Sequence, residues 1–116
     1  MRRTVLLVAV VAACLVMASG VALAATITGT ADNETLRGTA FADTIRAGAG
    51  DDVVRGLRGG DTIRGGDGTD RVYGQGGNDR IFVEGAGRDF VECGPGVDTA
   101  RVDRGDRTTR DCERVR

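Results

Sequence analysis

Apolar side chains recur along this chain with a period of nine residues. From Gly29 to Phe82 it divides without a gap into six nine-residue units: GTADNETLR, GTAFADTIR, AGAGDDVVR, GLRGGDTIR, GGDGTDRVY and GQGGNDRIF. The eighth position of each unit is aliphatic, and these residues are Leu36, Ile45, Val54, Ile63, Val72 and Ile81. Because the two flanking positions are mostly polar, each triplet predicts a three-residue strand whose middle side chain points inward.

The other six positions of each unit predict a turn. Glycine holds the first position in five of the six units, and it supplies the left-handed conformations that tight turns need. The sixth position is always acidic, and these residues are Glu34, Asp43, Asp52, Asp61, Asp70 and Asp79. Two looser units follow a one-residue insertion near Val83; they are EGAGRDFVE, from Glu84, and CGPGVDTAR, from Cys93.

Units of one strand and one turn predict a solenoid. With two units per coil, strands separated by two nonapeptides stack in parallel about 4.8 Å apart. The inward side chains then form two columns, Leu36–Val54–Val72 and Ile45–Ile63–Ile81. We therefore expect an all-β fold, a right-handed parallel β-roll (β-solenoid) of about four coils. At about 1.5–3 kcal/mol per buried aliphatic side chain, this core is thin and needs help.

That help is predicted to come from the acidic turns. Stacking brings Asp52 beside Asp70 and Asp61 beside Asp79, and carboxylates that close repel each other. A divalent cation between the turns removes the repulsion, and Ca²⁺ takes about 6–8 carboxylate and carbonyl oxygens, whereas Mg²⁺ demands stricter octahedral geometry. The ordinary preference of aspartate for turns explains one or two of these residues, but not an unbroken register.

The repeated pattern resembles the repeat-in-toxin (RTX, haemolysin-type) nonapeptide GGxGxDxUx, in which U is aliphatic, over residues 29–101. The resemblance implies calcium ions between stacked turns. One turn would provide the carbonyls of its second and fourth residues and its aspartate. The turn one coil later would provide its first and third carbonyls and its own aspartate.

Carrying this scheme over gives two best sites. The first has Gly48, Gly50 and Asp52 opposite Gly65, Asp67 and Asp70. The second has Leu57, Gly59 and Asp61 opposite Gly74, Gly76 and Asp79. A third would join Gly66, Gly68 and Asp70 to Glu84, Ala86 and Asp89. A fourth would join Gln75, Gly77 and Asp79 to Cys93, Pro95 and Asp98.

The first two units depart from the pattern, because Asp32 and Phe41 stand where the fourth glycine belongs. The turns of Glu34 and Asp43 are therefore expected either to bind weakly or to serve only as an N-terminal cap. We expect about two to four Ca²⁺ ions in all, with folding coupled to their binding.

Residues 1–24 have the features of a secretory signal peptide. Arg2 and Arg3 precede an apolar run, and Ala22-Leu23-Ala24 is a small-x-small cleavage signal. We expect a secreted, extracellular protein with no membrane span after cleavage. The alternatives are an uncleaved anchor, a lipoprotein modified at Cys14, and twin-arginine export. A chain that orders only in extracellular calcium would cross the membrane largely disordered, which argues against the last.

Cleavage would leave two cysteines, and in an oxidising compartment these predict a Cys93–Cys112 disulfide. Two free thiols are the alternative. The domain organisation that follows is a signal peptide (1–24), calcium-binding repeats (25–101) and a polar C-terminal cap tied by the disulfide (102–116).

The composition restricts catalysis. The 116-residue chain has no lysine or histidine, and its one serine, Ser19, lies in the leader. Histidine bases, serine nucleophiles and lysine Schiff bases are thereby excluded. Only carboxylates remain, as in glycosidases, and nearly all of them belong to turns. We expect no enzymatic activity.

Arginine is the only basic residue type, and it holds the ninth position of the first four units, at Arg37, Arg46, Arg55 and Arg64. These side chains should point outward and give each sheet a basic stripe ending in Tyr73 or Phe82. The simpler interpretation is solubility. The alternative is an adhesion module that binds the cell envelope or an anionic surface polymer. No nucleic acid partner is expected.

Overall fold

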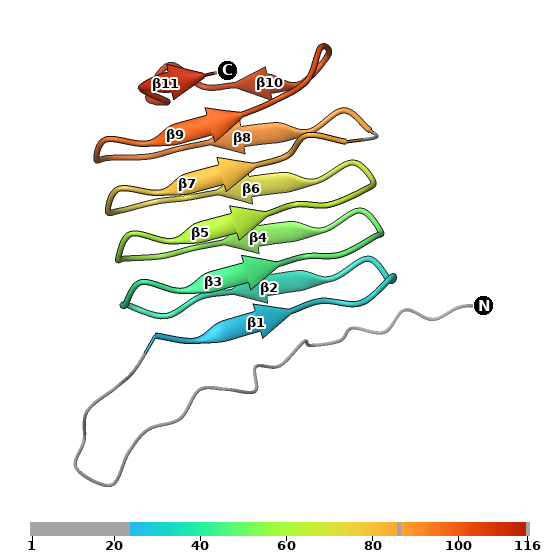
Figure 1. Ribbon diagram of the computed structural model, residues 1–116, viewed down its shortest axis with the longest axis horizontal. Helices are drawn as coiled ribbons and strands as arrows, with labels where there is room; N and C mark the ends of the chain where they lie inside the picture. The colour runs from blue at the N-terminus through green and yellow to red at the C-terminus, as the bar shows by residue number, and fades with distance from the viewer. Residues whose placement is uncertain (1–23, 86, 116) are drawn as a thin grey trace, which may run out of the picture.

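The computed structural model describes residues 24–85 and 87–115. Of the sequence-based predictions, the signal peptide before Ala24, the alternative lipidation of Cys14 and the ligand role of Ala86 lie outside the described residues. Within these ranges the chain winds into a coil of short parallel strands, with no helix (Figure 1). The predicted β-roll is confirmed.

The strands form two sheets that face each other, and each coil contributes one strand to each sheet (Figure 1). The odd-numbered sheet consists of β1 (Thr26–Thr28), β3 (Thr44–Arg46), β5 (Thr62–Arg64), β7 (Arg80–Phe82), β9 (Thr99–Arg101) and β11 (Arg114–Val115). The even-numbered sheet consists of β2 (Thr35–Arg37), β4 (Val53–Arg55), β6 (Arg71–Tyr73), β8 (Phe90–Glu92) and β10 (Arg107–Thr108).

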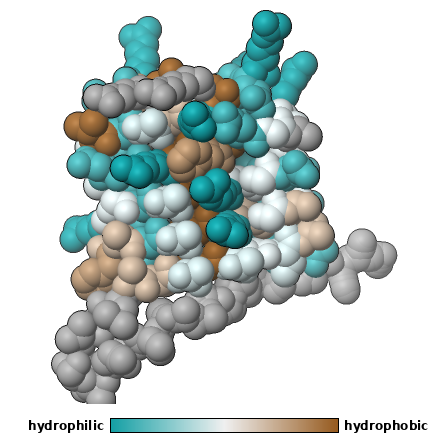
Figure 2. Space-filling view, in the orientation of Figure 1, coloured by the Kyte–Doolittle hydropathy of each residue, from teal (hydrophilic) through white to brown (hydrophobic). Residues whose placement is uncertain are grey.

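The middle residue of each strand builds the core, as the nine-residue period predicts. In the even sheet Leu36, Val54, Val72 and Val91 stack in register. In the odd sheet the column is Ile27, Ile45, Ile63, Ile81 and Ala100. None of these side chains is more than 2% exposed. The flanking positions are mostly exposed or half-buried. Figure 2 shows hydrophilic and intermediate residues interspersed over one face, with hydrophobic residues visible between them.

The roll has about five turns, one more than the sequence predicts. The difference arises at both ends. β1 precedes the first complete nonapeptide, and the segment 102–116, expected to form a C-terminal cap, contains β10 and β11. These two strands pair in parallel with β8 and β9 and so extend both sheets.

The inserted residue is absorbed at the start of one turn. Gly65 lies under Val83, at the regular spacing of two nonapeptides, whereas Gly68 lies under Gly87, at a spacing longer by one. The extra residue therefore falls between them, and the side chain of Glu84 is exposed. Beyond this point the strands keep the longer spacing, with Arg71 paired to Phe90.

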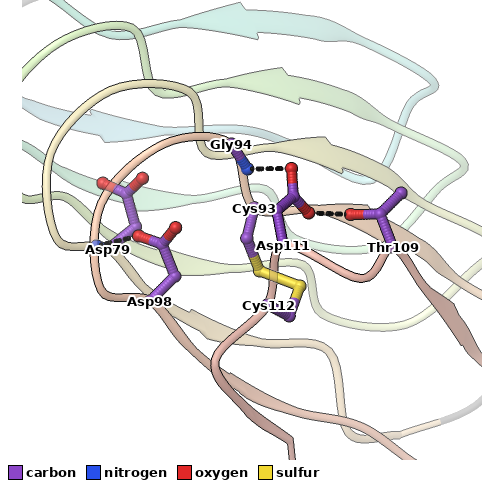
Figure 3. The surroundings of a disulfide bond; sticks show 7 residues. All are labelled: Asp79, Cys93, Gly94, Asp98, Thr109, Asp111 and Cys112. Carbon is purple, nitrogen blue, oxygen red and sulfur yellow. Dashed lines mark hydrogen bonds between the residues drawn. A yellow bond between two sulfur atoms is a disulfide. The ribbon is translucent and has the colours of Figure 1, made fainter.

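A disulfide joins Cys93 to Cys112, whose Cα atoms are 5.0 Å apart (Figure 3). Both cysteines are buried, at 0% and 8% exposure. Beside the disulfide the Gly94 N–H donates to Asp111 Oδ2 at 2.9 Å, and the Thr109 hydroxyl donates to the same carboxylate. The disulfide thus ties the last turn of the roll to the coil below it.

Two residues other than glycine adopt left-handed backbone conformations, Leu57 at φ 69° and Gln75 at φ 64°. Both occupy the second position of their unit, where Gly48 and Gly66 adopt the same conformation. A side chain in this region costs about 1–2 kcal/mol relative to glycine, although glycine in turn loses more entropy on folding. Gln75 is exposed, so its side chain contributes little packing.

We therefore predict that Gln75→Gly stabilises the calcium-loaded roll by about 0.5–1 kcal/mol. Chemical denaturation of the two proteins measures the change in the free energy of unfolding. The matched control is Arg58→Gly, also in an exposed turn but outside the left-handed region, and it should destabilise. Equal effects of the two substitutions would refute the explanation.

Candidate metal sites

A ladder of acidic side chains runs up each edge of the roll, in the turns that connect the sheets. Each acidic residue of these ladders directly precedes a strand. From Asp52 onward, its side chain accepts the backbone N–H of the ladder residue one coil below. On one edge Asp70 Oδ1 accepts from Asp52 N at 2.9 Å, and Asp89 Oδ1 accepts from Asp70 N at 2.7 Å. On the other edge Asp79 Oδ1 accepts from Asp61 N at 2.8 Å and Asp98 Oδ1 from Asp79 N at 2.7 Å.

Each of these carboxylates uses only one of its two oxygens. Six Oδ2 atoms are buried and have no hydrogen-bond partner among the described residues; they belong to Asp52, Asp61, Asp70, Asp79, Asp89 and Asp98. None of the six residues is more than 2% exposed. Buried acceptors are normally paired, and an unpaired carboxylate oxygen is costly. Three of them lie on each ladder, where they are available as acceptors for a cation.

The first two acidic residues differ, because both of their carboxylate oxygens are hydrogen-bonded. Glu34 accepts the N–H of Thr30 at 2.7 Å and its hydroxyl at 2.6 Å. Asp43 Oδ2 accepts the N–H of Thr39 at 2.6 Å and Oδ1 its hydroxyl at 2.8 Å. A β-branched threonine disfavours the left-handed conformation that later units adopt at this second position. Its backbone and hydroxyl therefore bond the carboxylate that a metal would otherwise need.

Carbonyl oxygens of each turn face the coil above. A Cβ on Gly66 or Gly68 would overlap the carbonyl oxygen of Gly48 or Gly50, respectively. On the other edge Gly77 packs on the Gly59 carbonyl in the same way. Glycine is needed at these positions because the turns of neighbouring coils pack backbone against backbone. The structure thus brings together the turns that the sequence pairs at a spacing of two nonapeptides.

The glycine at the first position of a turn lies close to the unpaired carboxylate oxygen of the same turn. A Cβ on Gly56 would lie 2.5 Å from Asp61 Oδ2, on Gly74 2.6 Å from Asp79 Oδ2, and on Gly65 2.9 Å from Asp70 Oδ2. A side chain there would fill the space beside the carboxylate. Of the third-position residues, Asp67 is exposed and Gly76 has open space around it.

In the two looser units, which begin at Glu84 and Cys93, the acidic ladder continues with successive acidic residues 19 positions apart. Gly87 packs on the Gly68 carbonyl and Gly96 on the Gly77 carbonyl, while Gly94 packs on Gln75. Asp89 and Asp98 therefore stand above Asp70 and Asp79. In these turns the first-position counterparts of Gly65 and Gly74 are Val83 and Cys93, both buried, so Val83 rather than Glu84 occupies that place.

Burial raises the pKa values of the laddered aspartates. Loss of hydration is the largest cause; the backbone hydrogen bond lowers each pKa, and neighbouring carboxylates raise it again. The pKa reaches about 6 for Asp52 and Asp89, about 7 for Asp61 and Asp70 and about 8 for Asp79, and that of Asp98 is also raised. Near neutral pH the metal-free turns therefore retain protons that a cation would displace.

These shifts predict that the metal-free roll loses stability as the pH rises. An unfolded aspartate releases its proton near pH 3.8, whereas folded Asp61 and Asp70 hold theirs to about 7. Between these values the folded state binds more protons, so each pH step favours unfolding. Far-ultraviolet circular dichroism of metal-depleted protein should show more β-structure at about pH 4.5 than at about pH 8. Saturating calcium should abolish the difference, and a metal-depleted roll that gains structure as the pH rises would contradict the prediction.

The donor set suits a hard cation. No group of three or more His, Cys, Asp or Glu side chains that could hold a metal occurs among the described residues. Pairs of carboxylates supplemented by backbone carbonyls are nevertheless typical Ca²⁺ ligands. The unpaired oxygens, the carbonyls turned toward the next coil and the absence of histidine from the whole chain all fit calcium better than a softer metal.

The residue at the top of one ladder, Asp106, is not among those that the nonapeptide pattern predicts. Asp106 accepts the Asp89 N–H at 2.8 Å and the Asp103 N–H at 2.7 Å, so both of its oxygens are satisfied. It directly precedes β10, as the other laddered residues precede their strands. Asp106 follows Asp89 by 17 residues, less than the regular spacing, so it does not fit the nonapeptide pattern. Asp106 ends this ladder as Glu34 begins it.

The nonapeptides match a known protein family. A family model described as "RTX calcium-binding nonapeptide repeat (4 copies)" matches residues 28–63 and again residues 56–84. These matches contain the turns of Asp52, Asp61, Asp70 and Asp79, and they confirm the resemblance seen in the sequence. No curated protein and no solved structure matches the chain.

Proposed function

Residues 28–84 are RTX calcium-binding nonapeptide repeats, and from this premise we propose that the chain is a secreted module whose folding is coupled to Ca²⁺ bound between its stacked turns. The observation that carries the proposal is the set of six buried, unpaired Oδ2 atoms. These unpaired oxygens occur in turns whose second residue is not threonine, unlike the turns of Glu34 and Asp43.

The ligand pairs follow from adjacent members of each ladder. One ion would lie between the turns of Asp52 and Asp70, with carbonyls of Gly48, Gly50, Gly65 and Asp67. Another would lie between those of Asp61 and Asp79, with carbonyls of Leu57, Gly59, Gly74 and Gly76. The pairs Asp70–Asp89 and Asp79–Asp98 provide a third and a fourth site. Bound calcium would supply the positive charge that these carboxylates lack.

The thin core and the buried acidic residues of the metal-free roll explain why calcium binding would be coupled to folding. Each strand from β1 to β9 contributes one aliphatic side chain to the core of the roll, and eight acidic residues are buried beside that core. The raised pKa values of the laddered aspartates indicate that burial opposes their negative charge. Ions that bind only the stacked turns stabilise the folded state by mass action, and removing them leaves the repulsion uncompensated.

Secretion is part of the proposal, and it rests on the signal-peptide features of the sequence of residues 1–24. The Ala25 N–H, buried at 2% exposure, donates to Asp43 Oδ1 at 2.8 Å. Cleavage after Ala24 would turn this N–H into a charged amino group that pairs with the same carboxylate. Across residues 24–85 and 87–115, the structure contains no helix long and apolar enough to cross a membrane.

We propose a binding role rather than a catalytic one. RTX repeats are structural calcium-binding units, and the buried carboxylates are already engaged by backbone N–H groups. The expected arginine stripes lie in register, Arg37 with Arg55 and Arg46 with Arg64. Arg55 covers the Tyr73 ring at 5.5 Å and Arg64 the Phe82 ring at 4.9 Å. These contacts favour a structural role for the stripes over adhesion.

Isothermal titration calorimetry with Ca²⁺ and Mg²⁺ tests the proposal. We expect about two to four calcium ions per chain and a dissociation constant of roughly 10⁻⁴–10⁻³ M, the range of extracellular calcium modules. Magnesium at the same concentration should neither bind comparably nor displace calcium. A chain that binds no calcium, or binds both ions equally, would overturn the assignment.

A further inference from the structure

An open groove of about 740 Å³ lies on the outside of the even-numbered sheet, where β6, β8 and β10 run side by side. Three arginines and two aromatic residues line it, and these are Arg71, Arg88, Arg107, Tyr73 and Phe90. The groove adjoins the stripe of the even-numbered sheet, because Arg55 covers the Tyr73 ring at 5.5 Å. Its three arginines are nevertheless other residues than Arg37, Arg46, Arg55 and Arg64, which belong to strands nearer the N-terminal end of the roll. The nonapeptide pattern gives no reason for this combination.

The sheet register creates the arrangement. Arg71, Phe90 and Arg107 occupy one row across three neighbouring strands, so that an aromatic ring stands between two guanidinium groups. Strand spacing places the two arginine Cα atoms about 9–10 Å apart. The Tyr73 ring lies 6.2 Å from the Phe90 ring at an interplanar angle of 60°, and both residues are half-buried. The aromatic pair therefore forms a ridge with positive charge on both sides.

The charges of the groove are not neutralised within the described part of the protein. Arg71, Arg88 and Arg107 are exposed, and the one ion pair among the described residues joins Arg101 to Glu84. Asp70 and Asp89 also border the groove but are at most 2% exposed, and they are ligands in the proposed calcium sites. When those sites hold calcium, the groove presents positive charge to an anion.

We propose that this groove binds an acidic polysaccharide. Guanidinium groups form bidentate pairs with carboxylates, and the apolar C–H faces of sugar rings pack on aromatic side chains. The alternation of ring and charge matches a chain whose carboxylates are separated by sugar rings. A nucleic acid fits less well, because Glu92 follows Tyr73 in its row and acidic turns border the sheet, leaving no continuous basic track for phosphates.

The single tyrosine of the chain, Tyr73, provides a direct readout, since there is no tryptophan. The full chain is titrated with a hyaluronan oligosaccharide at saturating free calcium while tyrosine fluorescence is recorded. We expect a saturable change, absent with a neutral maltodextrin. The double variant Arg71→Gln/Arg107→Gln should bind about tenfold or more weakly, whereas the matched control Arg37→Gln/Arg46→Gln should bind as the unchanged protein does.

Circular dichroism of each protein separates this inference from the proposed function, on which it rests only through the requirement for a folded roll. If calcium induces β-structure in all of them and the oligosaccharide does not bind, the groove proposal is wrong. Equal weakening in both arginine variants, or tighter binding of poly(dT), would also overturn it. If calcium induces no structure, the failure lies with the proposed function instead.

Discussion

Replacing Asp70 by asparagine will remove calcium ions that replacement of Asp43 leaves in place. Asp70 Oδ1 accepts the Asp52 N–H, and asparagine can retain that bond with its own oxygen. The Oδ2 atom, which has no partner, becomes an NH₂ group that repels a cation. Because Asp70 stands between Asp52 and Asp89, it belongs to two of the proposed sites. We expect the loss of up to two ions and a calcium midpoint raised about tenfold or more.

Asp43→Asn is the matched control because Thr39 already satisfies the carboxylate of Asp43. This change should lower stability through a lost acceptor but leave the ion count unchanged. Calorimetry gives the number of ions in each variant, and circular dichroism gives the calcium midpoint. Without calcium near pH 8, Asp70→Asn should be more ordered than the unchanged protein, since a neutral side chain replaces a buried carboxylate. Equal ion counts in both variants would contradict the assigned ligands.

Removing the disulfide should have the second-largest effect. In the chain-entropy model, a bond between residues 19 apart contributes about 3 kcal/mol to the free energy of unfolding. Cys93→Ala/Cys112→Ala leaves small apolar side chains in buried positions and so isolates this contribution. β10 and β11, with two residues each, add few hydrogen bonds of their own. The last coil should therefore open first.

Denaturant unfolding in saturating calcium measures the total loss, and amide hydrogen exchange locates it. The unchanged protein treated with reductant is the control, and it should match the double variant. Exchange should quicken in residues 99–115 and change little in β3 to β6. A uniform increase along the roll, or a loss well under about 1 kcal/mol, would contradict the role assigned to the bond.

The nine-residue period predicted the strands, their register and the core, because every coil repeats one rule. The stacking of Val72 on Val54 and of Val54 on Leu36 follows from spacing alone. The ladder of acidic residues was predictable for the same reason. What the period could not supply was the hydrogen bonding of each carboxylate, since Asp43 and Asp61 occupy equivalent positions. The distinguishing signal was the second-position residue, threonine at Thr39 and leucine at Leu57.

Departures from the period were harder to predict. The insertion near Val83 lengthens the spacing between paired strands by one, and because the turn absorbs the extra residue, Phe90 still pairs with Arg71 at the equivalent position of its unit. Asp106 lies in a shortened turn and therefore falls outside the nonapeptide pattern. Both features depend on how the backbone absorbs an added or missing residue, and packing between coils decides that.

Far-ultraviolet circular dichroism during a calcium titration tests the central claim most directly, that ions between the acidic turns hold the coils together. The chain should be largely disordered in chelator at about pH 7.5 and should gain β-structure cooperatively as calcium rises toward about 10⁻³ M. Excess chelator should reverse the change. A β-structured spectrum that is the same with calcium and with chelator would contradict the account.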